Sequence, residues 1–127
     1  MVPQTPLVAC VDDDVSVCDT IKAFLAAFGF AAETFLSAEE FLQSDRLAEI
    51  SCLITDVRLK GMSGLQLQNR LAASGSRVPV IVITAVADDR VREQALSAGA
   101  VCCLYKPFSK EDLLTCLRSA LNRRDED

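Results

Sequence analysis

Three aspartates and one lysine stand immediately after short apolar runs of this chain: Asp12, Asp13, Asp56 and Lys106. Crowded carboxylates repel one another, so at least one of them would be pushed toward protonation if no cation lay nearby. A hard divalent ion such as Mg²⁺, which prefers oxygen ligands, would relieve that repulsion. A lysine is a compact positive charge that suits an oxygen atom of a phosphate group. If these four residues meet in the fold, they are suited to transfer of a phosphoryl group.

A carboxylate is the natural nucleophile for such a site. The chain contains no histidine, so it lacks the base that usually activates a serine or cysteine nucleophile. Its six cysteines form no C-x-x-C pair, and without histidine they complete no usual zinc set. An aspartate that attacks a phosphoryl group forms an acyl phosphate, and a divalent cation neutralises charge on the moving group. The residues therefore predict Mg²⁺-dependent phosphorylation of one aspartate, with Mn²⁺ as an alternative cation.

Apolar runs alternate with helical stripes along the whole chain. The expected strands are Leu7–Val11, Phe30–Phe35, Ser51–Thr55, Pro79–Thr84 and Val101–Tyr105. The expected helices are Val15–Phe28, Ser37–Asp45, Leu65–Ala73, Arg90–Ala98 and Ser109–Asn122. The fourth strand is a Val/Ile run without polar alternation, which is typical of a strand covered on both faces. The pattern predicts an α/β fold: a doubly wound parallel sheet with right-handed crossovers.

This fold would bring distant residues together. The carboxyl ends of parallel strands lie along one edge of an open sheet, and ligands bind at that edge. Asp12, Asp13, Asp56, Thr84 and Lys106 all stand at or just past the ends of expected strands. A lone Asp, Thr or Lys at a strand end usually serves a turn. Four such places with compatible chemistry instead favour one common site.

Composition limits the class of protein. With 127 residues, the chain has the size of one ordinary domain that can bury a core. Half of the residues are hydrophobic (50%) and 24% are charged, as in soluble globular proteins. The net charge of −5 argues against binding of nucleic acid by this domain. No apolar stretch is long enough to span a bilayer and no secretion signal opens the chain, so we expect a cytoplasmic protein that does not contact membranes.

The cysteines have a plain structural interpretation. Most of them lie among apolar residues, where a free thiol behaves as a small hydrophobic side chain, so we expect buried and reduced thiols. The neighbours Cys102 and Cys103 could suggest a redox sensor. Adjacent cysteines rarely form a disulfide without backbone strain, so we do not favour a disulfide between these two.

Five sequence blocks resemble, in order and spacing, the signature blocks of response-regulator receiver domains: Val11–Asp14, Ile54–Leu59, Gly61–Gly64, Ile83–Ala85 and Tyr105–Phe108. The resemblance covers about Thr5 to Asn122. The segment around Asp56 and the Lys-Pro-Phe block are most similar to receivers of nitrogen-fixation and nitrogen-regulation transcription factors. We therefore expect a receiver domain over residues 1–122 and a tail, or the start of a linker to an output domain, over residues 123–127.

The resemblance implies a flavodoxin-like (βα)5 fold with strand order 2-1-3-4-5. It implies that Asp56 accepts phosphate from a sensor histidine kinase. Asp13 and Asp56 would bind Mg²⁺ through their side chains, Arg58 would bind it through the backbone carbonyl, and Asp12 would bind it through water. The chain departs from many members at Lys60, where they have proline, so this loop is expected to be more mobile and more basic.

The resemblance also assigns the phosphate contacts. Thr84 and Lys106 would contact the phosphoryl oxygens, the small Ala85 would leave access to the site, and the Lys106–Pro107 bond would be cis. Family members usually carry Phe or Tyr three residues before the lysine, as the partner that moves with the threonine. Cys103 stands there in this chain, and a thiol sweeps less area than an aromatic ring. The usual coupling of threonine to that aromatic side chain is therefore in question.

The expected function is a signalling switch rather than an enzyme. Phosphorylation would alter an output surface and control transcription through a domain absent from this chain, or through a partner protein. The resemblance also implies a phosphorylation-dependent homodimer through the fourth helix, fifth strand and fifth helix. An Asp-nucleophile phosphatase is an alternative, but such enzymes typically need a lid, for which the chain has no insertion. A pure interaction module would lack one of the acids, the threonine or the lysine, and none is missing.

Overall fold

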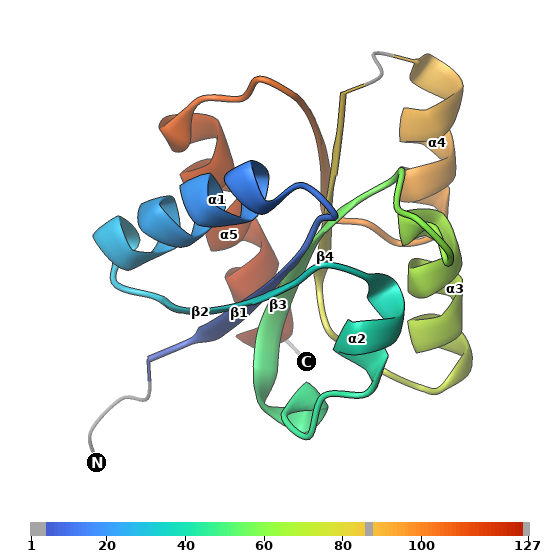
Figure 1. Ribbon diagram of the computed structural model, residues 1–127, viewed down its shortest axis with the longest axis horizontal. Helices are drawn as coiled ribbons and strands as arrows, with labels where there is room; N and C mark the ends of the chain where they lie inside the picture. Colours follow the sequence, from blue (N-terminus) through green and yellow to red (C-terminus); the bar gives the residue numbers. More distant parts are fainter. Residues whose placement is uncertain (1–4, 86–87, 126–127) are drawn as a thin grey trace.

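Five parallel strands form one sheet in the computed structural model, which describes residues 5–85 and 88–125 (Figure 1). The strands are β1 (Leu7–Val11), β2 (Ala31–Phe35), β3 (Ile50–Asp56), β4 (Val80–Thr84) and β5 (Cys102–Tyr105). Their order across the sheet is β2-β1-β3-β4-β5, and every neighbouring pair is parallel. The flavodoxin-like α/β fold and the 2-1-3-4-5 order expected from the sequence are confirmed.

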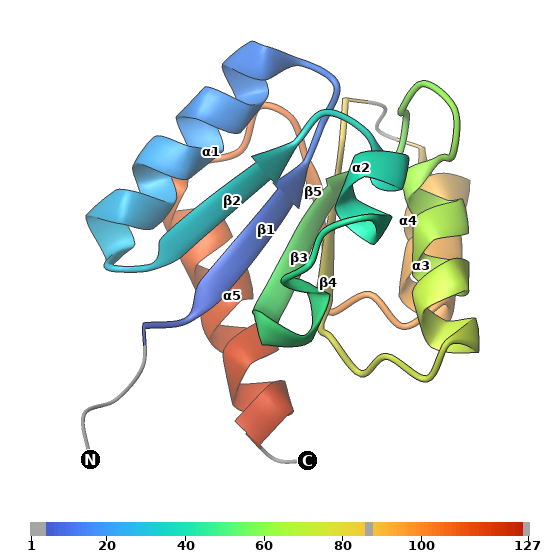
Figure 2. The same ribbon diagram turned by 60° about the horizontal axis from the view of Figure 1, so that its bottom comes forward.

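Helices cover both faces of the sheet (Figures 1 and 2). The helices on one face are α1 (Val15–Phe28) and α5 (Lys110–Asp125). Those on the other face are α2 (Ala38–Leu42), α3 (Gly64–Ala73) and α4 (Asp89–Ser97), and a short 3-10 turn, η1 (Leu47–Glu49), leads into β3. Among the helices of the described residues, none has the length and apolar character needed to cross a membrane.

The sheet separates two apolar cores, because a strand turns successive side chains to opposite faces. Along β1, Val8 and Cys10 face the core under α1 and α5, whereas Ala9 and Val11 face the core under α2, α3 and α4. The whole of β4 is buried as well, as expected for a Val/Ile strand that is covered on both faces. In the three central strands, β1, β3 and β4, polar side chains are found only near the strand ends.

The helix α2 is shorter than the sequence suggested. It ends at Leu42 rather than near Asp45. The hydroxyl of Ser44 accepts a hydrogen bond from the backbone N–H of Arg46, 3.1 Å away. Local bonding of this kind competes with the helical hydrogen-bond pattern, which explains the early end.

The helix α5 is longer than expected. It runs to Asp125, past the expected end near Asn122. The expected boundary between the receiver domain and a tail or linker at residue 123 stays a prediction. No glycine or proline interrupts the sequence of this segment, which is compatible with a longer helix. The last two residues of the expected tail, 126 and 127, lie outside the described residues.

Candidate functional site

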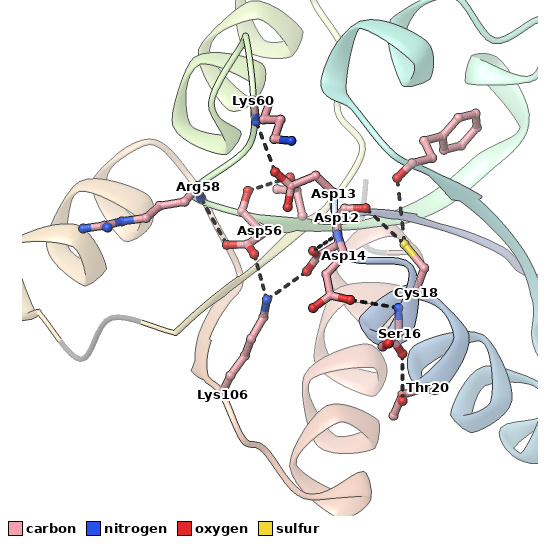
Figure 3. Close-up of polar contacts among 12 residues, drawn as sticks. Asp12, Asp13, Asp14, Ser16, Cys18, Thr20, Asp56, Arg58, Lys60 and Lys106 are labelled. Carbon is pink, nitrogen blue, oxygen red and sulfur yellow. Dashed lines mark hydrogen bonds and ion pairs between the residues drawn. The ribbon is translucent and has the colours of Figure 1, made fainter.

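The acids and the lysine singled out by the sequence lie at one edge of the sheet (Figure 3). Asp12 follows β1, Asp56 ends β3, Thr84 ends β4 and Lys106 follows β5. The register of the strands places these ends side by side, since Asp56 is opposite Ile83 in the β3–β4 pair. Four segments that are far apart in the chain therefore meet at this edge, as predicted.

Lys106 bridges two carboxylates. Its Nζ donates a hydrogen bond to Asp56 Oδ2 at 2.7 Å and another to Asp12 Oδ2 at 2.9 Å. Burial opposes the charge on this lysine, but the hydrogen bonds to Asp56 and Asp12 outweigh burial and raise the pKa of Lys106. The ammonium group therefore stays protonated at neutral pH and lies where a phosphate oxygen could be bound.

Asp12 is the least solvated acid of the site. It is 0% exposed, and burial raises the pKa of its carboxyl group even though Lys106 and the backbone N–H of Asp14 donate hydrogen bonds to it. The nearby charge of Asp56 raises that pKa further. The carboxylates of Asp12 and Asp56 thus share one lysine, Lys106, which leaves the site with a net negative charge.

The carboxylate of Asp56 is held in place by the loop that follows it. The backbone N–H of Arg58 donates to Asp56 Oδ1 at 3.1 Å. The N–H of Gly64 donates to the carbonyl of Val57 at 2.9 Å, which draws the start of α3 against the end of β3. A Cβ atom at Gly64 would collide with the backbone carbonyl oxygen of Asp56, so only glycine permits this approach.

Two carboxylates on other elements hold the same loop. Asp13, which is exposed, accepts a hydrogen bond from the N–H of Lys60 through Oδ2 at 3.3 Å. Glu39 reaches across from α2 and accepts one from the N–H of Met62 at 3.1 Å. The loop between β3 and α3 is therefore fixed on both sides, and Lys60 contributes its backbone to the site.

The remaining predicted phosphate contacts lie next to this core of the site. Thr84 is 1% exposed, and its carbonyl accepts a hydrogen bond from the N–H of Lys106 at 2.8 Å. Ala85, the residue expected to leave access to the site, is exposed. The Lys106–Pro107 bond is cis, which agrees with the prediction. The structure thus brings Thr84 and Lys106 together at the ends of two neighbouring strands.

The position usually taken by an aromatic side chain is partly buried here. Cys103 lies opposite Val82 and packs against the core under α2, α3 and α4, and burial raises the pKa of its thiol. Two residues later, Tyr105 lies opposite Thr84. Among the described residues, the buried hydroxyl of Tyr105 has no hydrogen-bond partner. The structure assigns no role to either residue in the chemistry.

The donor set of the site fits a hard divalent cation by its chemistry. Asp12, Asp13 and Asp56 supply carboxylate oxygens at one edge, and the carbonyl of Arg58 follows in the adjoining loop. Burial, and to a lesser extent the charge of Asp56, raises the pKa of Asp12, and a cation would offset both effects. Within residues 5–85 and 88–125, no three Asp, Glu, Cys or His side chains are already arranged to hold a metal ion. The Lys106 bridge takes part of that space, so binding would require these side chains to adjust.

Two supporting residues were not assigned from the sequence. The sequence did contain a signal for Gly64, because this residue ends the glycine-punctuated loop that follows Asp56. Glu39 had none, because it was assigned only to the start of a helix and its partner Met62 lies in a different part of the chain. A contact between separate elements leaves no periodic pattern in the sequence.

The chain is similar to known proteins over almost its whole length. The sequence matches the family of response regulator receiver domains over residues 8–118. The response regulator protein TmoT of Ectopseudomonas mendocina is 37% identical over 118 residues, which cover 93% of this chain and 54% of TmoT. The transcriptional regulatory protein FixJ of Azorhizobium caulinodans is 34% identical over 124 residues, which cover 98% of this chain and 59% of FixJ.

Solved structures give the same result. The response regulator StyR superposes with a TM-score of 0.89 at 38% identity, over 97% of this chain and 62% of the StyR chain. The chain spans about half the length of the curated relatives that it matches.

Proposed function

Because the chain belongs to the family of response regulator receiver domains, we propose that Asp56 accepts a phosphoryl group from a sensor histidine kinase. The family match and the similarity to FixJ also confirm the resemblance that the sequence blocks indicated. The observation that carries the proposal is the bridge from Lys106 to Asp56 and Asp12 at the edge of the sheet. It places a buried acid, a cation and a candidate nucleophile in direct contact.

The chemistry of the proposal follows from these positions. One carboxylate oxygen of Asp56 bonds to phosphorus while the bond between phosphorus and the imidazole nitrogen of the donor breaks. Lys106 already donates to Asp56 Oδ2, so its ammonium group lies beside the oxygens that arrive with the phosphoryl group. We expect the hydroxyl of Thr84 to contact another of those oxygens, while Ala85 leaves room for them.

Asp12, Asp13 and Asp56, together with the carbonyl of Arg58, are the groups that would hold Mg²⁺. When bound, the ion would supply positive charge against the oxygens of the transferred group. Mn²⁺, which has a similar preference for oxygen ligands, would serve in its place. Receiver domains of this family generally use Mg²⁺ for phosphorylation, and the donor set here is suited to it.

The domain would act as a switch rather than as an enzyme with a separate substrate. Phosphorylation shifts a two-state equilibrium and changes a surface that a partner recognises. We propose that this surface includes α4, β5 and α5 and that it forms a homodimer. In support, β5 is an edge strand, and Leu96 on α4 leaves 39% of its surface exposed.

For the longer protein to which such a domain would belong, we propose control of transcription in the cytoplasm. The name of FixJ describes a transcriptional regulatory protein, and FixJ is longer than this chain. The output domain would then follow α5, whose last described residue is Asp125.

The test is the mass of the intact protein after incubation with Mg²⁺ and acetyl phosphate. We expect the wild type to gain one phosphoryl group and Asp56→Asn to gain none. Asp14→Asn is the matched control, because Asp14 caps α1 through the N–H of Ser16 and asparagine caps equally well. Equal phosphorylation of the wild type and Asp56→Asn, or repeated turnover of small phosphoesters, would contradict the proposal.

A further inference from the structure

The loop between β3 and α3 contributes backbone groups to the phosphorylation site. The N–H of Arg58 donates to Asp56 Oδ1 at 3.1 Å, and the carbonyl of Arg58 is a proposed ligand of the cation. A backbone carbonyl binds a cation tightly only if its segment already has the right shape, because ordering a loop on binding weakens the affinity. The contacts that hold this loop therefore bear on the chemistry of the site.

Two carboxylates outside the loop hold its backbone. Asp13 Oδ2 accepts a hydrogen bond from the N–H of Lys60 at 3.3 Å (Figure 3), and Glu39 Oε2 accepts one from the N–H of Met62 at 3.1 Å. Asp13 is itself a proposed ligand of Mg²⁺, so its oxygens would be shared with a bound cation. Glu39 is then the carboxylate that is left to hold the loop while the cation is bound.

The helix α2 gives Glu39 a firm base. Phe41 on this helix is 1% exposed, and its ring meets that of Phe35 edge-on with centroids 5.4 Å apart. The neighbouring Glu40 serves the start of the helix itself, since its Oε2 accepts from the N–H of Leu36 at 2.9 Å. Among the described residues, Glu39 takes part in no ion pair. Its carboxylate therefore serves the loop from an anchored helix.

The backbone of the loop packs directly against this carboxylate. A Cβ atom on Gly61 would lie 2.5 Å from Glu39 Oε2, and the φ of Gly61 is +78°. Both the close carboxylate and the left-handed backbone thus favour glycine at this position. The next residue, Met62, supplies the N–H donor of the contact.

We propose that Glu39 is a positioning residue for phosphoryl transfer to Asp56, an inference that rests on the proposed function. Glu39 acts through the loop rather than on the phosphoryl group or the cation. By holding the N–H of Met62, it keeps the loop in the shape in which the carbonyl of Arg58 can bind Mg²⁺. Without this hydrogen bond, the cation has to order the loop as it binds, which lowers its affinity.

The first experiment measures phosphorylation of the full chain by acetyl phosphate over a range of Mg²⁺ concentrations. We expect Glu39→Ala to raise the Mg²⁺ concentration for the half-maximal rate about fivefold, as loss of one exposed hydrogen bond to a charged group does. The rate at saturating Mg²⁺ should remain close to that of the wild type, since the bound cation then orders the loop. A role of Glu39 in stability alone would instead lower the Tm without Mg²⁺ and leave the half-maximal concentration unchanged.

Glu39→Gln separates the hydrogen bond from the charge. Its amide oxygen can still accept from the N–H of Met62, so this variant should keep the half-maximal Mg²⁺ concentration of the wild type. Glu40→Gln is the matched control, because it removes the same charge one residue away from the contact, and it should also behave as the wild type. If either variant behaved like Glu39→Ala, negative charge on α2 would govern Mg²⁺ binding, and the proposal would be overturned.

Gly61→Ala tests the contact from the side of the loop. Its methyl group would displace the Glu39 carboxylate, so we expect a similar rise in the half-maximal Mg²⁺ concentration. Gly75→Ala is the control for backbone strain, since Gly75 has a φ of +82° and nothing within 4 Å of a Cβ atom. Adding Glu39→Ala to Gly61→Ala should cause no further rise, because both changes remove one hydrogen bond. Effects that multiply in the double variant would show that Glu39 does not act through this contact.

An NMR titration with MgCl₂ keeps the role of Glu39 separate from the proposed function. The shifts of the backbone amides of Lys60 and Met62 give the Kd of Mg²⁺ without any phosphoryl donor, and Glu39→Ala should raise this Kd about fivefold. An unchanged Kd in Glu39→Ala, or no Mg²⁺ binding by the wild type, would refute the role of Glu39. Mg²⁺ binding by a wild type that acetyl phosphate does not phosphorylate would instead refute the proposed function.

Discussion

At the scale of single residues, burial of the Asp12 carboxyl group is the feature of the site that most opposes folding at neutral pH. Burial and the charge of Asp56 raise the pKa of Asp12 despite its hydrogen bonds from Lys106 and the N–H of Asp14. A carboxyl group whose pKa is higher in the folded state than in the unfolded state holds its proton longer when folded. Stability is therefore lost as pH rises from the ordinary value of 3.8 through the raised value. The fold carries this cost at neutral pH.

Asp12→Asn should consequently stabilise the protein at pH 7. The amide still accepts a hydrogen bond from Lys106, and the buried negative charge is removed. We expect a gain of about 1 kcal/mol, since one pKa unit corresponds to about that energy. The gain should shrink as pH falls below the raised pKa and vanish below the ordinary pKa of 3.8, where the wild-type carboxyl is protonated in both states. Urea unfolding at pH 7 and at lower pH measures both values.

The matched control for this prediction is Asp14→Asn. Asp14 is exposed and caps α1, so the same loss of charge should change stability by less than about 0.5 kcal/mol. If Asp12→Asn proved less stable than the wild type at pH 7, the ion pair with Lys106 would outweigh the burial of the charge.

At the scale of elements, the start of α3 sets the position of Asp56. Ser63 caps this helix and accepts from the N–H of Gln66, while the side chain of Gln66 accepts from the N–H of Ser63. This reciprocal pair fixes where the helix begins, and Gly64 then sits directly against the carbonyl of Asp56. The helix is thus docked on the strand end without any side chain between them.

Gly64→Ala should disturb both stability and chemistry. The added methyl group meets rigid backbone, so we expect a loss of about 1–3 kcal/mol, as for other overpacked sites. The shift of the Asp56 backbone should also slow phosphorylation by acetyl phosphate. Chemical unfolding and the rate of mass gain provide the two measurements.

Gly29→Ala separates these two effects. Gly29 ends α1 at a φ of +89°, with nothing within 4 Å of a Cβ atom. Alanine in this left-handed conformation should cost about 1–2 kcal/mol without touching the site. Phosphorylation at the wild-type rate in Gly29→Ala but not in Gly64→Ala is the expected result, and equal slowing in both variants would refute a specific role for Gly64.

At the scale of the whole molecule, the proposed cation site exists only when the chain is folded. Asp12 and Asp56 belong to different strands, and Asp13 is joined to them only through the sheet edge. Mg²⁺ should therefore bind the folded state alone and raise Tm. At a concentration one hundred times its Kd, the expected stabilisation is about 2.7 kcal/mol.

Thermal unfolding with MgCl₂, compared with NaCl at equal ionic strength, measures this effect. Asp13→Asn should reduce the shift, because Asp13 is exposed and its main described contact is the hydrogen bond from Lys60. If Mg²⁺ raised the Tm of Asp13→Asn as much as that of the wild type, Asp13 would not be a ligand of the cation. If Mg²⁺ did not raise the Tm of the wild type, the proposed cation site would be refuted. This readout does not depend on phosphorylation.

Local patterns in the sequence determined the elements and the candidate residues. The period of apolar residues marked five strands and five helices, and the ends of those strands marked Asp12, Asp56, Thr84 and Lys106. The parallel arrangement then required these ends to share one edge. Helix ends were less certain, since caps and competing local bonds, such as that at Ser44, act over one or two residues.

Only the tertiary structure decided which groups touch. Lys106 lies between Asp12 and Asp56, Glu39 holds the loop after β3, and Cys102 and Cys103 pack into the cores on opposite faces of the sheet. The strand order and the packing of helices on each face set these contacts, and neither is written in any local pattern. Contacts between residues far apart in the chain depend on the whole fold. The sequence therefore identified the candidate residues, whereas the tertiary structure determined which of them are in contact.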